Sequence, residues 1–200
     1  MAHRLALHAC CGPCSLEPVR LLREEGFEPT ILWFNPNIQP QAEHDHRLRV
    51  LRDWAARAAV EVVEVPGYER GCEAWERACA PAGFDRPRRC RACYALRLEA
   101  ACAAAESMGF SHVSTTLVVS PYQLFDECHE VLRALALRHG LVPVWRDFRP
   151  WYPQATDEAR SLGMYRQSYC GCRFSAAEAA LGREVSRDQR KAEREAARRA

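Results

Sequence analysis

The sequence predicts an α/β protein in which a parallel sheet carries helices on both faces. Two observations predict this fold class. Short apolar runs typical of strands alternate with amphipathic helical segments along most of the chain, and such alternation produces parallel sheets. The 200 residues, 48% hydrophobic and 27% charged, suit one compact globular domain with an attached lobe or tail.

The predicted elements follow one another as strand, turn and helix. Residues 4–9 form an apolar strand, and residues 15–25 form a helix in which Leu16, Val19 and Leu22 have helical spacing. The same patterns predict further strands at 27–34, 60–65, 112–119 and 141–145, and further helices at 41–59, 90–108 and 122–139. Ligands are then expected beyond the carboxyl ends of the strands.

We expect two sections, a domain over residues 1–175 and a charged helical tail over 176–200. The aromatic and polar segment 147–175 is expected to form a flap over the sheet edge. The formal net charge is +2, and residues 182–200 alone contribute +3. Because the rest of the chain is nearly neutral, nucleic-acid contacts would depend on local arginine patches. Lys191 is the only lysine, which argues against Schiff-base chemistry and a P-loop.

The abnormal feature of the composition is its eleven cysteines. No run approaches the ~18 apolar residues of a membrane span, and the N-terminus lacks the apolar core of a signal peptide. We therefore expect a cytoplasmic protein without a membrane partner. Because the cytoplasm opposes structural disulfides, the cysteines indicate metal binding or redox chemistry.

Cys10, Cys11 and Cys14 occupy the turn between the first strand and the first helix. Backbone amides and the helix dipole at such a turn favour thiolates, which bind metals and act as nucleophiles. Adjacent cysteines serve one site only where the chain leaves extended geometry, as Gly12 and Pro13 allow. The segment Cys11-Gly12-Pro13-Cys14 also matches the dithiol motif of thioredoxin-like proteins, and this alternative predicts a thiol-disulfide oxidoreductase.

A second pair, Cys90 and Cys93, lies at the start of a helix among arginines. Two intervening residues let one helical turn direct two sulfurs at one ion or cluster, and two such groups supply a four-thiolate shell. Zinc uses the same ligands, so a zinc-binding module without catalysis is a further alternative. Four other cysteines stand singly on helical segments and are interpreted as core or partly exposed residues: Cys72, Cys79, Cys102 and Cys128.

Cys170 and Cys172 bracket Gly171 near the end of the flap. A disulfide across one residue closes a small strained ring, which suits redox switching better than stapling. Two reduced thiols in a loop, or two further metal ligands, are alternatives with the same spacing.

Six segments, in this order, resemble the QueH family of epoxyqueuosine reductases over about residues 5–175. They are HACCGPC from His8, WFNPNIQP from Trp33, CRACYALRL from Cys90, TTLVVSPYQ from Thr115, DFRPWY from Asp147 and YRQSYCGC from Tyr165. The resemblance implies a Rossmann-like three-layer fold, similar to the adenine nucleotide alpha-hydrolases, and reduction of epoxyqueuosine to queuosine at the wobble position of tRNA. Cysteines stand where such folds carry a phosphate-binding Ser-Gly-Gly turn, so ATP is not expected.

The resemblance also implies the cofactors. A 4Fe-4S cluster would be held by Cys10, Cys11, Cys90 and Cys93. Cys170 and Cys172 would form a redox-active disulfide, and a mononuclear iron is expected beside the cluster, with Cys14 as its nearest spare ligand. The expected partner is tRNA carrying epoxyqueuosine, and the sequence does not identify the external electron donor.

Removal of an epoxide oxygen as water takes two electrons and two protons, so a proton donor is required. His8 and Asp147 are candidates, and each also suits a supporting role in the fold. Six residues in polar motifs at strand ends are candidates for reading the modified base: Asn35, Asn37, Tyr122, Gln123, Arg149 and Gln167.

An anticodon loop would be held by aromatic stacking and by arginine–phosphate contacts. The aromatic candidates are Trp33, Phe34, Trp151, Tyr152 and Tyr165, and the cationic ones are Arg86, Arg88, Arg89 and Arg91. His44 and His46 stand two residues apart on a helix and point to different faces, so both are expected on the solvated surface.

Overall fold

The chain divides into two compact units, Met1–Arg166 and Gln167–Ala200. The computed structural model describes residues 3–199, apart from the side chains of 191, 192 and 195–199. The division falls before the 175/176 boundary of the sequence-based organisation, so the last part of the expected flap belongs to the second unit.

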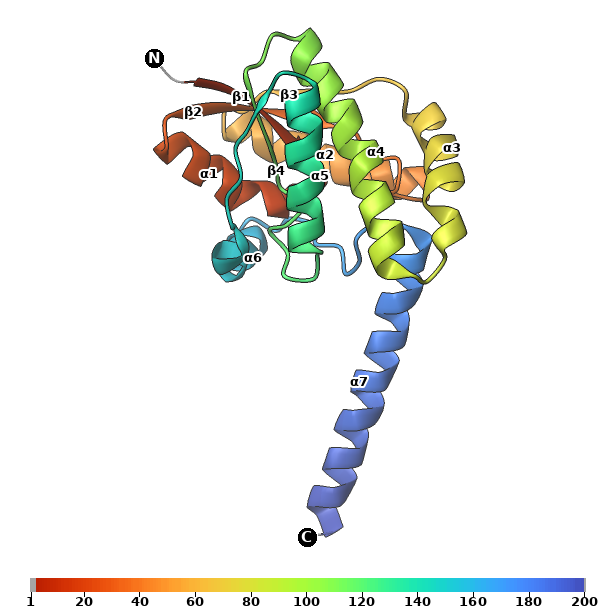
Figure 1. The fold of residues 1–200 in the computed structure, drawn as a ribbon. Helices are drawn as coiled ribbons and strands as arrows, with labels where there is room; N and C mark the ends of the chain where they lie inside the picture. The colour runs from red at the N-terminus through yellow and green to blue at the C-terminus, as the bar shows by residue number, and fades with distance from the viewer. Residues whose placement is uncertain (1–2, 200) are drawn as a thin grey trace. The chain divides into compact units, whose positions relative to one another are not determined.

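The first unit contains a five-stranded sheet in the order β3-β2-β1-β4-β5 (Figure 1). The strands are β1 (His3–Ala9), β2 (Phe27–Trp33), β3 (Val62–Glu64), β4 (His112–Thr115) and β5 (Val142–Pro143). Every neighbouring pair is parallel. The predicted α/β fold with a parallel sheet is confirmed, and each predicted strand exists, although the last three are shorter than expected.

Helices follow the strands as the alternation predicts. The first unit holds α1 (Leu16–Glu24), α2 (Gln41–Arg57), α3 (Tyr68–Ala78), α4 (Arg86–Ser107), α5 (Phe125–Arg138) and α6 (Tyr152–Ser161). The sequence analysis set no bounds for α3 or α6. It interpreted Cys72 and Cys79 as lying on helical segments and missed that Tyr68, Cys72 and Trp75 share one helix face, and α6 lies in the segment expected to be a flap. Short 3-10 turns precede α1, α4 and α6.

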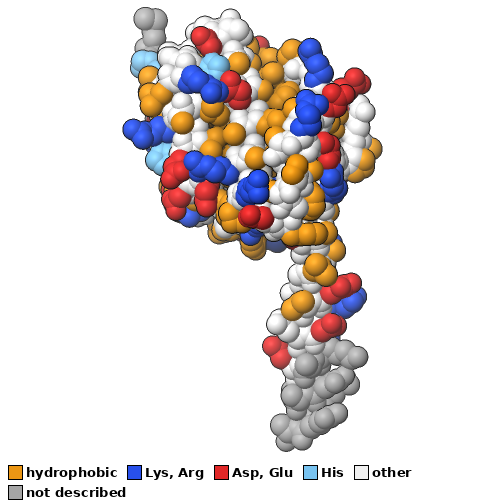
Figure 2. Space-filling view, turned by 45° about the vertical axis from the view of Figure 1, so that its right-hand side comes forward, with side chains coloured by type: hydrophobic (Ala, Val, Ile, Leu, Met, Phe, Trp, Pro, Cys, Tyr) orange, Lys and Arg blue, Asp and Glu red, His pale blue; other side chains and the backbone are white. Residues whose placement is uncertain are grey.

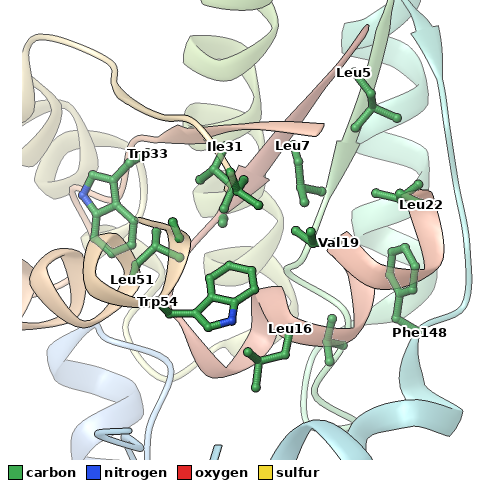
Figure 3. Close-up of a cluster of buried hydrophobic side chains, with 14 of the residues drawn as sticks. Leu5, Leu7, Leu16, Val19, Leu22, Ile31, Trp33, Leu51, Trp54 and Phe148 are labelled. Atoms are coloured by element: carbon green, nitrogen blue, oxygen red, sulfur yellow. The ribbon is translucent and has the colours of Figure 1, made fainter. Parts of the chain in front are cut away.

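Two buried clusters, one on each face of the sheet, make the three layers. Side chains alternate along a strand, so Leu5 and Leu7 of β1 point to one face while Ala6 points to the other. The first cluster joins β1 and β2 to α1 and α2 (Figure 3), and Ala159 of α6 packs against it. The second joins the sheet to α4 and α5, for example through Leu98 and Leu132.

The second unit contains α7 (Arg173–Arg199), which begins directly after Cys172. The expected charged helical tail is therefore a helix that starts three residues earlier than the predicted start, Ala176. None of the helices in the described part of the chain combines the length and the apolar character needed to cross a bilayer.

Candidate functional site

Strands β1, β2 and β4 end level with one another at the carboxyl edge of the sheet. Ala9 pairs with Trp33, and His8 pairs with both Leu32 and Thr115. The residues that follow these strands, from Cys10 onward and from Phe34 onward, therefore emerge at one edge. This is the edge at which parallel sheets bind ligands.

The turn after β1 brings three cysteines together. The Ser15 hydroxyl donates to the Cys11 carbonyl oxygen at 2.9 Å, and the Ser15 N–H donates to the Gly12 carbonyl oxygen at 2.8 Å. These bonds close a 3-10 turn, so the chain leaves extended geometry at once. The Cys10 thiol consequently makes hydrogen bonds with the thiols of both Cys11 and Cys14.

The thiols of this turn differ in their pKa. Hydrogen bonds from Cys11 and Cys14 lower the pKa of Cys10 well below its usual value, and the charge of Arg97 adds to this effect. Hydrogen bonds with Cys10 and Cys11, together with burial, raise the pKa of Cys14 well above its usual value. Cys10 is thus the thiolate of the group, and Cys14 is the thiol that donates to it.

The second cysteine pair lies in the first two turns of α4. Asp85 caps this helix by accepting a hydrogen bond from the Arg88 N–H at 3.3 Å. Cys90 is half-buried and Cys93 is buried. A hydrogen bond from Cys79 is the main cause that lowers the pKa of Cys93 to about 6, and the charge of Arg97 lowers it further. Cys93 therefore also favours the thiolate at neutral pH.

Arg97 links the two cysteine groups. Its charge acts on both Cys10 and Cys93. Its Nη2 donates to Asn35 Oδ1, and Asn35 Nδ2 donates to the Ala9 carbonyl oxygen at 2.8 Å, directly before Cys10. Residues more than 80 positions apart in the chain therefore lie around one cation on the α4 side of the sheet.

The ligand set of the expected cluster stays a prediction. Among the described residues, no group of three or more Cys, His, Asp or Glu side chains has the arrangement that a single metal ion requires. A 4Fe-4S cluster separates its four ligand sulfurs more widely than one tetrahedral ion does, because each sulfur binds a different iron. The structure provides two groups of thiols, in each of which one thiol has a lowered pKa, Cys10 in the first and Cys93 in the second, and the charge of Arg97 acts on both.

His8 is fully buried and makes two hydrogen bonds. The Phe34 carbonyl oxygen can only accept, so His8 Nε2 carries the ring proton and donates to it at 3.3 Å. His8 Nδ1 then accepts from the Thr115 hydroxyl at 3.1 Å, and Thr115 Oγ1 also accepts from the Leu117 N–H. Burial, reinforced by Arg97, lowers the pKa of His8 to about 3. The ring is therefore neutral, and its only N–H is already donated within the protein.

Asp147 lies at the surface beside Arg149. The Arg149 guanidinium donates to both carboxylate oxygens of Asp147, at 2.8 and 2.7 Å, and the guanidinium carbon lies 3.8 Å from the centre of the Phe125 ring. The hydrogen bonds from Arg149 hold the pKa of Asp147 below its usual range. At neutral pH Asp147 is a carboxylate that orients Arg149.

The other candidates for substrate contact differ in how many of their polar atoms already make hydrogen bonds within the protein. Asn35 is engaged at both ends of its amide, and Gln123 Oε1 accepts from the Tyr94 hydroxyl at 2.9 Å. Tyr122 is 72% exposed. Among the described residues, neither amide atom of Asn37 has a hydrogen-bond partner, although Asn37 is 1% exposed, and the same holds for the Oε1 of Gln167 in the second unit.

The second unit contains the remaining cysteine pair. Gly171 has φ +143°, a conformation that L side chains rarely adopt, so glycine is what allows the turn between Cys170 and Cys172. The Ser175 N–H in the first turn of α7 donates to Cys172 Sγ at 3.4 Å. A backbone donor aimed at this sulfur stabilises negative charge on it.

Several surface expectations are wrong. Trp33, Phe34 and Arg89 are buried, at 1%, 8% and 1% exposure, so they belong to the core and not to an RNA-facing surface. His44 is also buried, and its Nε2 accepts from Trp33 Nε1 at 2.7 Å. On the face shown in Figure 2, basic and acidic side chains are interspersed with hydrophobic ones.

The residues that sequence reasoning missed are Cys79 and Arg97. Cys79 was interpreted as a bystander, yet its thiol bonds that of Cys93. Arg97 follows Cys93 by four positions, which is one helical turn, so helical spacing was a usable signal for it. Cys79 is the C-cap residue of α3, and its spacing of four from Trp75 and seven from Cys72 was a usable signal that the three share one helix face.

Comparisons with known proteins agree with the motifs of the site. A family model described as "Epoxyqueuosine reductase QueH" matches residues 5–178. The chain is 33% identical to the epoxyqueuosine reductase QueH of Dehalococcoides mccartyi, over 88% of this chain and 93% of that protein, and 27% identical to that of Thermotoga maritima, over 84% and 88%. A solved structure, the predicted subunit of a tRNA methyltransferase from Methanocaldococcus jannaschii, aligns with a TM-score of 0.49 and 11% identity, over 79% of this chain and 74% of that one. The chain belongs to the QueH family of epoxyqueuosine reductases.

Proposed function

We propose that this protein converts epoxyqueuosine to queuosine in tRNA, with a 4Fe-4S cluster held by Cys10, Cys11, Cys90 and Cys93. Family membership supports the reaction. The observation that best supports the cofactor is that the charge of Arg97 lowers the pKa of both Cys10, which follows β1, and Cys93, on α4.

The donor set suits this cofactor. Thiolates bind iron–sulfur clusters, and the two cysteines whose pKa is lowered belong to different groups, one from each side of the expected cluster. Cys14 contacts Cys10 and Cys11 and is the nearest spare ligand for a mononuclear iron. When bound, the cluster supplies single electrons, and a neighbouring iron supplies a Lewis acid for the epoxide oxygen.

His8 and Asp147 act in this proposal as positioning residues. His8 keeps its proton on Nε2, bonded to the Phe34 carbonyl oxygen, and thereby fixes the end of β2 against β1. Asp147 is ionised and holds the Arg149 guanidinium over the Phe125 ring, where it can meet a phosphate or the modified base. Neither residue holds a proton that it would readily give up at neutral pH.

Asn37 is the strongest candidate for contact with the modified base. Both of its amide atoms are buried without a partner among the described side chains and backbone groups. A buried amide of this kind costs free energy in the unbound protein, and a ligand that supplies a donor and an acceptor would recover it. The hydrogen-bonding edge of a base offers both.

The dithiol of Cys170 and Cys172 is proposed to return electrons to the site. The two thiols give up two electrons and two protons as the S–S bond forms, which equals the requirement of one epoxide reduction. An external reductant would then restore the thiols. We expect Cys170→Ser to support a single turnover and to lose multiple turnover. Full multiple turnover by this variant would remove the dithiol from the mechanism.

The experiment that tests the proposal is anaerobic reconstitution with iron and sulfide, followed by incubation with tRNA that contains epoxyqueuosine and a chemical reductant. Nucleoside mass spectrometry should show the loss of one oxygen atom. Cys93→Ala should abolish both the brown absorption and the turnover. Cys102→Ala is the matched control, because it removes another buried cysteine from the same helix, and it should preserve both.

The two alternatives give different results in the same experiment. A thiol-disulfide oxidoreductase would be colourless and would reduce a model disulfide through Cys11 and Cys14. A zinc-binding module would be colourless, would retain zinc and would leave the tRNA unchanged. Reconstituted protein that fails to remove oxygen from epoxyqueuosine in tRNA would refute the proposal.

A further inference from the structure

Arg97 is a cation buried in the centre of the first unit. Its side chain is 0% exposed, and it belongs to α4, which packs on the sheet through the second cluster. Transfer of a guanidinium from water to such a place costs several kcal/mol unless other charges and hydrogen bonds offset it. The neighbours of Arg97 should therefore show which negative charge offsets that cost.

The helix itself directs Arg97 toward the cysteines. Residues three, four and seven positions apart share one face of a helix, so Cys90, Cys93 and Arg97 form one stripe on α4. On the opposite side, Asn35 accepts from Arg97 and donates to the Ala9 carbonyl oxygen. Asn35 thus fixes the guanidinium beneath the turn that holds Cys10.

The groups on which Arg97 acts come from several elements. They are Cys10 after β1, Cys93 on the same helix, His8 on β1 and Cys128 on α5. His8 is neutral, and burial raises the pKa of the Cys128 thiol to about 12, so it too is neutral. Cys93 lies one helical turn before Arg97 on α4, and the Asn35 link to the Ala9 carbonyl oxygen places Arg97 next to Cys10.

We propose that Arg97 is the buried counter-charge of the metal–thiolate group that Cys10 and Cys93 help to hold, and that it sets the reduction potential of that group. This inference rests on the proposed function for the identity of the group. Four thiolates around a 4Fe-4S core carry a net negative charge, and addition of one electron makes that charge larger by one. A nearby fixed cation favours the more negative state and therefore raises the reduction potential.

Arg47 shows why Arg97 is assigned this role. Arg47 is also buried, and its charge also acts on Cys10 and Cys11. Its Nε, however, donates to Glu43 Oε1 at 2.7 Å, so it carries a carboxylate of its own. Arg47 therefore pairs with a carboxylate on its own helix, whereas Arg97 shares one face of α4 with Cys90 and Cys93.

The test measures the reduction potential of the reconstituted protein without tRNA, by anaerobic titration with dithionite followed by absorption and electron paramagnetic resonance. Arg97→Gln removes the charge, and Arg97→Lys retains it. We expect Arg97→Gln to lower the equilibrium constant for one-electron reduction at least tenfold, which is about 59 mV. Arg97→Lys should remain within threefold of the natural protein, as should the surface control Arg138→Gln, whose arginine is exposed and pairs with Glu99.

A second variant tests the same charge effect if Arg97→Gln fails to take up the cluster. Asn35→Asp has the same shape as the natural residue and places a carboxylate against Arg97, so it offsets the charge while the arginine stays. It should shift the potential in the same direction as Arg97→Gln. An unchanged potential in Asn35→Asp, or an equal shift in Arg97→Lys and Arg97→Gln, would overturn the inference.

The outcomes separate this inference from the proposed function. A shifted potential in protein that leaves epoxyqueuosine unreduced would refute the reductase proposal alone. An unchanged potential in variants that still reduce epoxyqueuosine would refute the role of Arg97 alone. If the natural protein takes up no cluster, both the inference and the proposed cofactor are wrong.

Discussion

Asn35 and Asn37 provide a matched pair for testing how the protein uses buried amides. They stand two residues apart after β2 and are 0% and 1% exposed. Asn35 is hydrogen-bonded to Arg97 and to the Ala9 carbonyl oxygen, whereas neither amide atom of Asn37 has a partner among the described residues. Leucine has the same number and branching of side-chain heavy atoms as asparagine, so replacement of each by leucine removes the amide and adds the same two methyl groups at both positions.

The two replacements should differ strongly in free energy of unfolding. Asn35→Leu leaves a buried carbonyl and a buried guanidinium N–H without their partner, and each costs about 1–3 kcal/mol. We therefore expect a loss of about 3 kcal/mol or more. Asn37→Leu leaves no protein group unsatisfied and removes an amide whose burial is uncompensated, so the free energy of unfolding should change by less than about 1 kcal/mol.

The assay is urea unfolding of the reconstituted protein under anaerobic conditions, followed by circular dichroism. With a slope of about 2 kcal/mol/M, Asn35→Leu should lower the midpoint by about 1.5 M, and Asn37→Leu should leave it nearly unchanged. In steady-state turnover, the KM for tRNA should rise more in Asn37→Leu than in Asn35→Leu, which is the reverse of their order in lost stability. If Asn37→Leu destabilised the protein as much as Asn35→Leu, the assignment of the Asn37 amide to a ligand would be wrong.

Three further predictions concern other parts of the molecule. Burial raises the pKa of Cys102 to about 12, so this thiol should resist iodoacetamide at pH 8 in the folded protein and react after unfolding. Peptide mapping would measure the modification, and modification before unfolding would contradict the burial of Cys102. The hydrogen bond that His139 donates to Glu106 is the main cause that raises the pKa of His139. The contribution of this bond to stability should be complete below about pH 6.5 and disappear as the pH rises through the raised pKa, and thermal unfolding of His139→Gln should lack this dependence. A Cβ at Gly71 would lie 2.8 Å from Phe34 Cζ, so Gly71→Ala should lower the free energy of unfolding by about 1–3 kcal/mol, whereas the control Gly182→Ala, in open space on α7, should not lower it.

The sequence predicts the order of the sheet elements because each local pattern agrees with the fold. The apolar run of β1, the spacing of Leu16, Val19 and Leu22 and the stop at Gly26 are all local signals, and all are confirmed. At α3 the signal was present and was missed. Tyr68, Cys72, Trp75 and Cys79 follow one another at spacings of four, three and four, which is the pattern of one helix face.

The surface predictions fail for a related reason. His44 and Arg89 belong to residue types that are usually exposed, and helical periodicity assigns them no apolar face. Their burial depends on partners supplied by distant segments: the Trp33 indole bonds His44, and the Gly83 carbonyl accepts from Arg89. A buried polar residue is determined by such partners, and one sequence does not display them.

The cysteine groups show how local and long-range information combine. Spacing alone indicates that the Cys10 turn and the Cys93 helix each suit thiolate chemistry, but it leaves zinc, iron–sulfur and dithiol interpretations open. The sheet order β2-β1-β4 narrows the problem, because it places the end of β1 in the centre of the sheet, beneath α4. A cation on that helix can then act on both groups at once, as Arg97 does. A dithiol of Cys11 and Cys14 would make no use of a buried cation shared with Cys93, whereas the negative charge of the proposed cluster would be offset by one.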